Sequence, residues 1–174
     1  YGQYLDSLEM TATIKGFEPL YIQRIAQLTN KSNQFNLTTL RCSEDDIRAM
    51  AGDKNDLCLC GKLVDKFGDN GIVTVVAGRQ QGDVLDLTLW LMSCRVLKRG
   101  MEDAMMDTVV AEAAARGVKT IVGHYYPTAK NAMVRKFYAQ YDFAKTAEDA
   151  DGNTEWTLDV AAYTPKHPHM KIER

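Results

Sequence analysis

The sequence predicts a single α/β domain built around one mixed sheet. Three apolar runs in the middle of the chain are separated by turn residues, which predicts a three-stranded antiparallel meander. A helical pattern follows the third run and leads into a further apolar run. Because two neighbouring strands joined through a helix are parallel with a right-handed crossover, the sheet is expected to contain both kinds of pairing.

The N-terminal third is predicted to supply one strand and two helices. Residues 10–15 alternate between polar and apolar side chains, as a strand does. An apolar stripe from Tyr21 to Leu28 repeats at helical spacing, and the polar stretch 29–39 ends that helix because its side chains compete for backbone hydrogen bonds. Ser43 is the expected N-cap of a second, short helix with an acidic first turn.

The middle third carries the meander and the crossover helix. Strands are predicted at 56–67, 72–78 and 84–97. Asn70–Gly71 is the expected turn of the first hairpin, since both residues tolerate positive φ. The crossover helix is expected to run from 101 to about 116, where an Arg-Gly pair stops it.

The last third is predicted to add a strand at 118–126, a helix over 127–143 and a final strand at 154–163. The domain is expected to span residues 10–163. Residues 164–174 are expected to form a flexible tail.

Length and composition indicate the broad class of protein. With 174 residues, 45% of them apolar and 25% charged, the chain is long enough to bury a real core. A net charge of −2 predicts no general attraction to nucleic acid or to membranes, and no apolar run is long enough to span a bilayer. The first residues lack the pattern of a signal peptide, so a cytoplasmic location is expected.

The four cysteines do not form a disulfide framework at this length. Cys58 and Cys60 are expected to share one face of a strand. Since no second pair and no nearby histidine accompany them, they are interpreted as packed, reduced thiols, and no metal site is expected. His167 and His169 belong to the expected tail.

A cluster of cations stands where strand 84–97 meets the crossover helix. Arg95, Lys98, Arg99 and Gly100 directly precede the helix that begins near Met101. The first turn of a helix presents free backbone N–H groups and a partial positive charge, and adjacent cations favour a phosphate or pyrophosphate there. The alternative is a solvated basic turn.

The string Arg95-Val96-Leu97-Lys98-Arg99-Gly100 resembles motif A of the GNAT acyltransferases, and the order of elements resembles that family too. The resemblance implies a GNAT-like fold in which strands 84–97 and 118–126 splay apart around a cleft. It also implies that backbone amides from Val96 to Met101 hold the pyrophosphate of coenzyme A or acyl-CoA, or the phosphate of a carrier protein's phosphopantetheine arm. Lys98 stands where the family usually has glycine.

The stretch "FYAQYDF" resembles the end of GNAT motif B, with Asp142 in place of the usual glycine. In that family the residue matching Tyr138 protonates the leaving thiolate, and the one matching Asn131 contacts the cofactor. Arg135 is expected on the same helical face and is taken as a further cofactor-binding residue. The alternative for Tyr138 is an aromatic side chain packed at the edge of the core.

A narrower resemblance covers nearly the whole chain. The segments "WLMSCRVLKRGME" and "GHYYPTAKNAMVRKFYAQYDF" look like the C-terminal part of FkbH-like proteins, in which a HAD-type phosphatase domain precedes a GNAT-like domain. The resemblance implies that residues 1–9 are a linker from an upstream HAD-type domain. It also implies a role in moving a glyceryl or acyl group onto an acyl carrier protein in polyketide biosynthesis. The alternative is a non-catalytic module that docks the carrier protein for that phosphatase domain.

The catalytic base and a nucleophile are left open by the sequence. His124, at the end of a strand, and Asp86 are equally eligible as the base. Cys94 lies one residue before the cation string, where strand alternation would place it on one face with Met92 and Val96. If that face lines the cleft, the thiol is a candidate nucleophilic relay; the alternative is a small apolar residue packed beneath the next helix.

Overall fold

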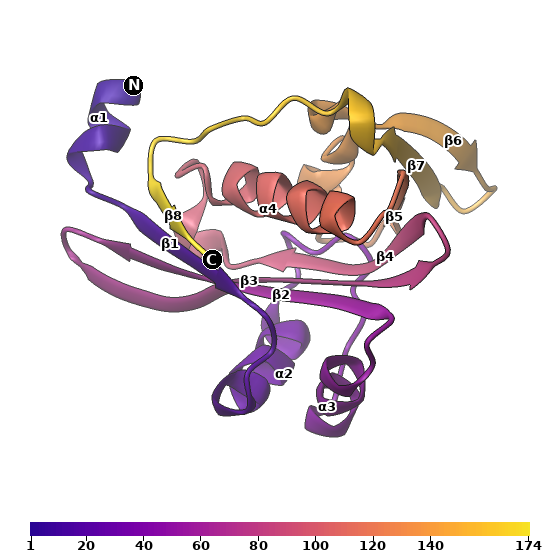
Figure 1. Ribbon diagram of the computed structural model, residues 1–174, viewed down its shortest axis with the longest axis horizontal. Coiled ribbons are helices and arrows are strands. Elements are labelled where there is room, and N and C mark those ends of the chain that lie inside the picture. The colour runs from indigo at the N-terminus through magenta and orange to yellow at the C-terminus, as the bar shows by residue number, and fades with distance from the viewer.

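The computed structural model describes residues 1–174 as one eight-stranded mixed sheet with strand order β6-β7-β5-β4-β3-β2-β1-β8. Helix α4 covers one face of the sheet, and α2 and α3 cover the other (Figure 1). The α-helices and strands are α1 Gly2–Ser7, β1 Thr11–Lys15, α2 Ile22–Lys31, α3 Glu44–Gly52, β2 Asp56–Asp65, β3 Gly68–Gln81, β4 Val84–Met92, α4 Met101–Ala115, β5 Thr120–Tyr125, β6 Ala144–Glu148, β7 Thr154–Asp159 and β8 Lys171–Glu173. Short 3-10 helices are η1 Pro19–Tyr21, η2 Cys94–Val96, η3 Ala132–Val134, η4 Tyr138–Tyr141 and η5 Val160–Ala162.

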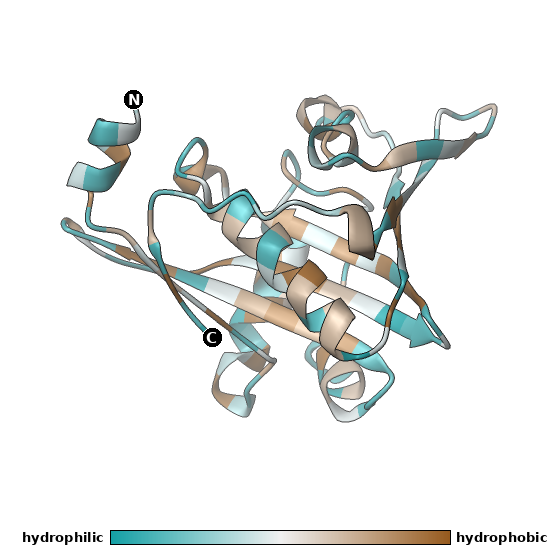
Figure 2. Ribbon diagram, turned by 45° about the horizontal axis from the view of Figure 1, so that its top comes forward, coloured by the Kyte–Doolittle hydropathy of each residue, from teal (hydrophilic) through white to brown (hydrophobic).

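Each face of the sheet has its own apolar core. The strands carry apolar residues beneath α4, and the larger cluster forms there (Figure 2). A second cluster lies between the sheet and the helices α2 and α3. On β4 the regular alternation of side chains between the two faces of the sheet is interrupted at Thr88. Leu87 faces the side of α4, whereas Leu89, two residues later, faces the side of α2 and α3. A bulge causes this, because Leu87 and Leu89 pair with the consecutive residues Gly78 and Ala77.

The expected splay of the parallel pair is confirmed. Strands β4 and β5 pair only where Val84–Asp86 lie beside Thr120–Val122, and they diverge beyond that point. The pairing starts just after the C-terminal stop of α4, where Gly117 adopts φ 77° as the helix prediction requires.

Residues 35–37 fill the opening between the two strands. The Leu37 N–H donates to the Trp90 carbonyl at 3.0 Å, and the Met92 N–H donates to the Phe35 carbonyl at 3.0 Å. On the other side, the Tyr126 N–H donates to the Leu37 carbonyl at 2.9 Å. The buried segment 35–37 therefore satisfies the free edge of β4 that the splay would otherwise leave unpaired.

The first hairpin turns earlier than expected. Asp65 pairs with Gly68, so the turn residues are Lys66 and Phe67 rather than Asn70–Gly71. The Asp65 carboxylate accepts a hydrogen bond from the Phe67 N–H at 2.8 Å, so the Asp65 side chain stabilises this turn. The positive φ of Gly71 instead serves an irregular pairing inside β3.

The third strand of the meander is shorter than predicted. It ends at Met92 instead of residue 97, and η2 follows. The Ser93 side chain accepts a hydrogen bond from the Arg95 N–H, so a capping serine stops the strand. The N-cap predicted at Ser43 is confirmed as a capping box with Asp46.

The helix expected over 127–143 is absent, and this is the largest error of the sequence interpretation. Only η3 and η4 form there. The Asn131 side chain explains why: its Oδ1 accepts the Thr128 N–H at 2.8 Å, and its Nδ2 donates to two carbonyls from other segments. A buried amide that bonds the local backbone competes with a regular helix.

Both ends of the chain are more ordered than expected. Residues 2–7, taken as linker, form α1, and Leu5 and Leu8 are buried in the larger core. In the expected flexible tail, Lys171–Glu173 form β8, which pairs in parallel with β1. The final predicted strand ends at Asp159, and β6, which the sequence interpretation missed, pairs beside it.

Candidate functional site

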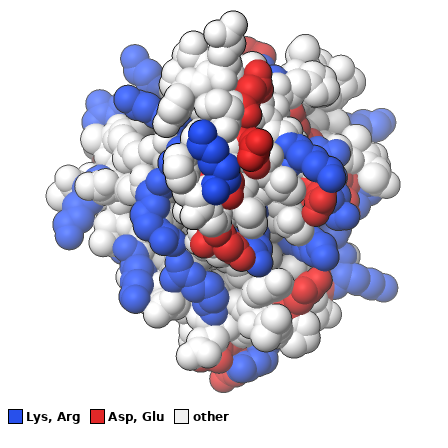
Figure 3. Space-filling view, turned by 90° about the vertical axis from the view of Figure 1, so that its left-hand side faces the viewer, with Lys and Arg blue, Asp and Glu red and all other residues white.

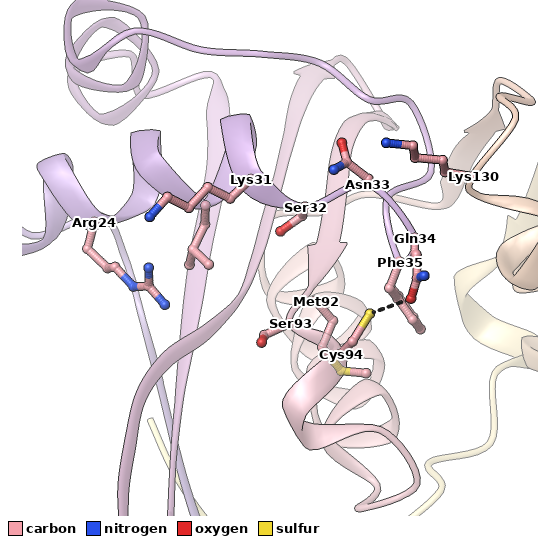
Figure 4. A pocket seen from close by; sticks show the side chains of 11 residues that line it. Arg24, Lys31, Ser32, Asn33, Gln34, Phe35, Met92, Ser93, Cys94 and Lys130 are labelled. Atoms are coloured by element: carbon pink, nitrogen blue, oxygen red, sulfur yellow. Dashed lines mark hydrogen bonds between the residues drawn. The ribbon is translucent and has the colours of Figure 1, made fainter.

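A cavity of about 550 Å³ opens at the end of β4. Figure 4 shows its walls: α2 and the loop after it on one side, the turn that follows β4 on another, and Lys130 beyond them. The lining residues are Arg24, Leu28, Lys31, Ser32, Asn33, Gln34, Phe35, Met92, Ser93, Cys94 and Lys130. Because β4 and the segment after β5 both contribute, the cavity lies at the mouth of the splay.

The cavity is cationic. Arg24, Lys31 and Lys130 line it, no carboxylate does, and none of the three makes an ion pair. Partial burial, and then the positive charge of Arg95, lower the pKa of Arg24. Two guanidinium groups therefore repel each other beside a wall that offers no counter-charge.

Cys94 lines this cavity, but its backbone is not the strand that the sequence predicted. Strand alternation does not apply to it, since β4 ends at Met92 and Cys94 begins η2. Its side chain is exposed, and its thiol donates a hydrogen bond to Gln34 Oε1 at 3.3 Å (Figure 4). The alternative of a cysteine packed beneath the next helix is therefore wrong.

The string expected to hold pyrophosphate is largely engaged within the protein. Arg99 donates to Asp65 Oδ2 at 2.9 Å, and only 5% of the Asp65 side chain is exposed. Burial alone would raise the pKa of Asp65, but hydrogen bonds from the Phe67 N–H and Arg99 lower it. Arg95 is exposed and donates to the Asn70 carbonyl at 3.3 Å.

The first turn of α4 is covered. A Cβ placed on Gly100 would lie 3.1 Å from Cβ of Pro168, so the C-terminal segment packs on this backbone. Val96 and Met101 are buried, and Leu97 packs against the same core. Lys98 is exposed with φ 63°, a left-handed conformation that explains the glycine of the related motif. Asp142 matches the second such glycine and has φ 66°.

Tyr138 is a core residue in this structure. Only 2% of it is exposed, and its ring packs against Trp90, Phe137 and Phe143. Gly123 of β5 makes room for it: a Cβ there would lie 2.5 Å from Cζ of Tyr138. Burial, and then the charge of Asp86, raise the pKa of Tyr138 far above its usual value.

Asn131 and Arg135 do not lie together at a cofactor site. Asn131 is fully buried, and its Nδ2 donates at 2.9 Å to the carbonyls of Asn36 and Tyr126. It therefore ties segment 35–37 to the end of β5. Arg135 is exposed and lines a separate cavity of about 420 Å³ beside Trp156.

The two candidate bases are brought together. His124 Nε2 lies 2.5 Å from Asp86 Oδ1, with His124 the more buried of the two. Glu155 is the cross-strand partner of His124, and the Tyr126 ring lies 5.9 Å from the imidazole. A histidine held by a carboxylate can accept a proton from a hydroxyl or amine.

The sequence interpretation missed most of the cavity lining. Neither Arg24 nor Lys31 was singled out, and the stretch 29–39 was interpreted as polar residues that end the helix. Cys94 and its neighbour Arg95 drew attention to this end of β4, and the polar run from Asn33 to Thr39 was considered as an acceptor-side wall or as helix capping and turns. Cys58 and Cys60, which were expected to be packed, reduced thiols, are half-buried and buried, and burial raises the pKa of each to about 12.

No model of a known protein family matches the chain, and no curated protein matches it by sequence. Solved structures do match. The ribosomal-protein-S18-alanine N-acetyltransferase of Escherichia coli has a TM-score of 0.65 at 15% identity, over 89% of this chain and 97% of that one. Spermidine N-acetyltransferase of Vibrio cholerae, in complex with CoA and spermine, has a TM-score of 0.65 at 10% identity, over 87% and 97%.

A third similar structure is the GNAT domain of S. lividans PAT, with a TM-score of 0.64 at 15% identity, over 84% of this chain and 89% of that one. At these identities the likeness shows the fold. The protein thus has the mixed α/β fold of the GNAT acetyltransferases, as the element order predicted. Among its helices, none has the length and apolar character that crossing a bilayer requires.

Proposed function

We propose that the protein is an acyltransferase domain that binds a phosphopantetheine thioester, either acyl-CoA or the arm of an acyl carrier protein. The observation that carries the proposal is the cationic cavity at the mouth of the β4–β5 splay. A GNAT fold with an anion-attracting, partly apolar cavity at that place suits a ligand with a charged phosphate and an extended arm.

The lining residues fit such a ligand. Arg24, Lys31 and Lys130 offer cationic side chains to a phosphate, while Phe35 and Met92 offer apolar surface to the arm. When bound, the thioester supplies an activated acyl group. The protein's own contributions are to hold the phosphate and to exclude water from the apolar part of the cavity.

We assign the proton-accepting role to the His124–Asp86 pair. Asp86 orients the imidazole through the hydrogen bond at Nε2, which leaves Nδ1 of His124 to accept a proton from an amine, hydroxyl or thiol. Tyr138 is the weaker candidate for proton transfer, because a buried phenol with a raised pKa gives up its proton reluctantly.

A second candidate is a docking module for an acyl carrier protein, serving an upstream HAD-type domain in an FkbH-like protein. One observation favours it: segment 35–37 occupies the splay through hydrogen bonds to β4 and to Tyr126, the residue directly after β5. A domain that only presents the arm of a carrier protein does not need an open cleft between β4 and β5.

Titration calorimetry with acetyl-CoA, free coenzyme A and an acyl-loaded carrier protein tests the proposal. Acetyl-CoA binding together with acyl transfer to an amine or hydroxyl supports the acyltransferase. Binding of the carrier protein without transfer supports the docking module. Binding of none of the three ligands contradicts both.

A further inference from the structure

The geometry points to the cavity walled by Arg24, Lys31 and Lys130 as a phosphate-binding site, in place of the string from Arg95 to Met101. This inference deepens the proposed function and rests on it in taking the phosphate of the arm as the ligand. Three features of the structure support it: the state of the string, the charges of the cavity and the fixed geometry of its loop.

Few charged side chains and backbone groups of the string from Arg95 to Met101 remain free to bind an anion. The Arg99 guanidinium is ion-paired with the nearly buried Asp65 carboxylate. Pro168 packs on the backbone of Gly100, at the N-cap of α4. Glu102 lies half-buried in the first turn of α4, so an acidic side chain, whose pKa burial raises, already lies beside the free N–H groups of the helix. A phosphate at that place would meet this carboxylate.

The cavity offers positive charge instead. Arg24 and Lys31 extend from α2, Lys130 lies on the far side, and no carboxylate stands among the lining residues (Figure 4). Arg24 is partly buried and is repelled by Arg95. Lys31 and Lys130 are exposed, whereas Arg24 is half-buried without a counter-charge, which is unfavourable, and a bound anion relieves that cost. Figure 3 shows basic side chains without acidic neighbours along one side of the face it views, whereas the other side carries both signs.

The loop of the cavity is held in a fixed geometry. The Arg41 guanidinium donates to the carbonyls of Thr29 and Ser32 at 2.6 and 2.8 Å, and to Asn33 Oδ1 at 2.5 Å. Because Asn33 Oδ1 accepts from Arg41, its NH₂ group is the part left to donate to a ligand. Arg41 is thus a positioning residue for a loop that lines the cavity.

Segment 35–37 directs a ligand to this cavity as well. The segment forms hydrogen bonds with the Trp90 carbonyl and the Met92 N–H. These are the backbone groups of β4 with which an arm lying in the splay would otherwise form hydrogen bonds. The phosphate end of a ligand at the mouth is therefore expected in the cavity beside Cys94. The volume of about 550 Å³ lies within the range of small-ligand sites.

The test compares a pocket variant, Arg24→Gln/Lys31→Gln/Lys130→Gln, with a charge-matched control, Lys15→Gln/Lys54→Gln/Lys119→Gln. The control residues are exposed, make no ion pairs and do not line the cavity. Calorimetry uses coenzyme A, inorganic pyrophosphate and pantetheine, which lacks the phosphate. Circular dichroism and thermal unfolding establish that both variants fold.

We expect coenzyme A and pyrophosphate to bind the wild type and the control alike, and the pocket variant about 10- to 100-fold more weakly. This loss should shrink at high salt, and pantetheine should show no such loss. A pocket variant that binds coenzyme A as tightly as the control overturns the inference and leaves the proposed function standing. If the wild type binds neither coenzyme A nor pyrophosphate, the phosphate site is wrong. The proposed function is then judged separately, by titration with the acyl-loaded carrier protein.

Discussion

His124 Nε2 lies 2.5 Å from Asp86 Oδ1, beside the last residue pair that joins β4 to β5. Asp86 of β4 pairs with Val122 of β5, and His124 lies two residues further along β5. Because side chains alternate along a strand, Val122 and His124 point to the same face of the sheet as Asp86. If this pair accepts the proton of the acyl acceptor, His124→Gln should lower kcat by about 10²-fold or more. Asp86→Asn should lower it by less, because the imidazole remains.

The readout for this pair is the pH profile of kcat together with its magnitude. Glu155→Gln serves as the control, because Glu155 is the cross-strand neighbour of His124 without a hydrogen bond to it. Unchanged kcat in both His124→Gln and Asp86→Asn would show that the base lies elsewhere.

Tyr138→Phe should leave turnover within a few-fold of wild type, because the phenol is buried and its raised pKa makes it a poor acid. Gly123→Ala should destabilise the fold by about 1–3 kcal/mol, since the added Cβ meets the Tyr138 ring. Steady-state kinetics and denaturant unfolding measure the two effects. A loss of roughly 10²-fold in Tyr138→Phe at unchanged stability would restore Tyr138 as a general acid.

Lys98→Gly and Asp142→Gly should each stabilise the protein by about 0.5–1 kcal/mol. Both residues adopt positive φ, where a side chain is strained and glycine is not. Lys98→Ala and Asp142→Ala are the matched controls, since alanine keeps the strain and should bring no gain. Urea unfolding measures the change in the free energy of unfolding. Equal effects of glycine and alanine at either position would mean that backbone strain is not the cause.

Leu37→Ala should cost about 2–5 kcal/mol of stability, because Leu37 is fully buried at the centre of the segment that fills the splay. Leu40→Ala is the control on the same loop; Leu40 is 39% exposed and should lose little. Hydrogen exchange should show slow amides at Leu37, Met92 and Tyr126, both with and without coenzyme A. Ligand-induced loss of protection at Leu37 would show that the segment leaves the splay on binding.

Cys94 should react with iodoacetamide at pH 8 at least about tenfold faster than the other three cysteines. It is exposed, whereas burial raises the pKa of Cys58 and Cys60 to about 12, so at pH 8 almost none of either is thiolate. Peptide mass spectrometry measures the labelling of each thiol, and Cys94→Ser should abolish the fast phase. Excess coenzyme A should slow it, because the thiol lines the proposed ligand cavity. Equal rates at Cys94 and Cys58 would contradict this.

Local signals in the sequence determined most of the elements. The acidic turn after Ser43, the Gly117 stop and the alternating runs of the meander each act over a few residues, and the structure has the predicted helix, helix stop and three antiparallel strands. The strand ends were predicted less well, since the first hairpin turns at Lys66–Phe67 and β4 ends at Met92. The parallel pairing of β4 and β5 was also predicted, because a helix that joins two neighbouring strands carries the chain back to the edge where the first strand began. Lys98 and Asp142 stand where the related motifs have glycine, and the structure shows that both adopt positive φ.

Only the tertiary structure decided what the candidate site contains. Arg99 could not be known to pair with Asp65, because that contact depends on the register of β2 and on the turn at Lys66–Phe67. The helix expected over 127–143 was lost to Asn131, whose amide bonds carbonyls 95 and 5 residues away along the chain. The cavity joins α2, the end of β4 and Lys130, which meet only when the sheet has formed. Side-chain patterns specify local backbone, whereas partners distant in the chain are set by packing.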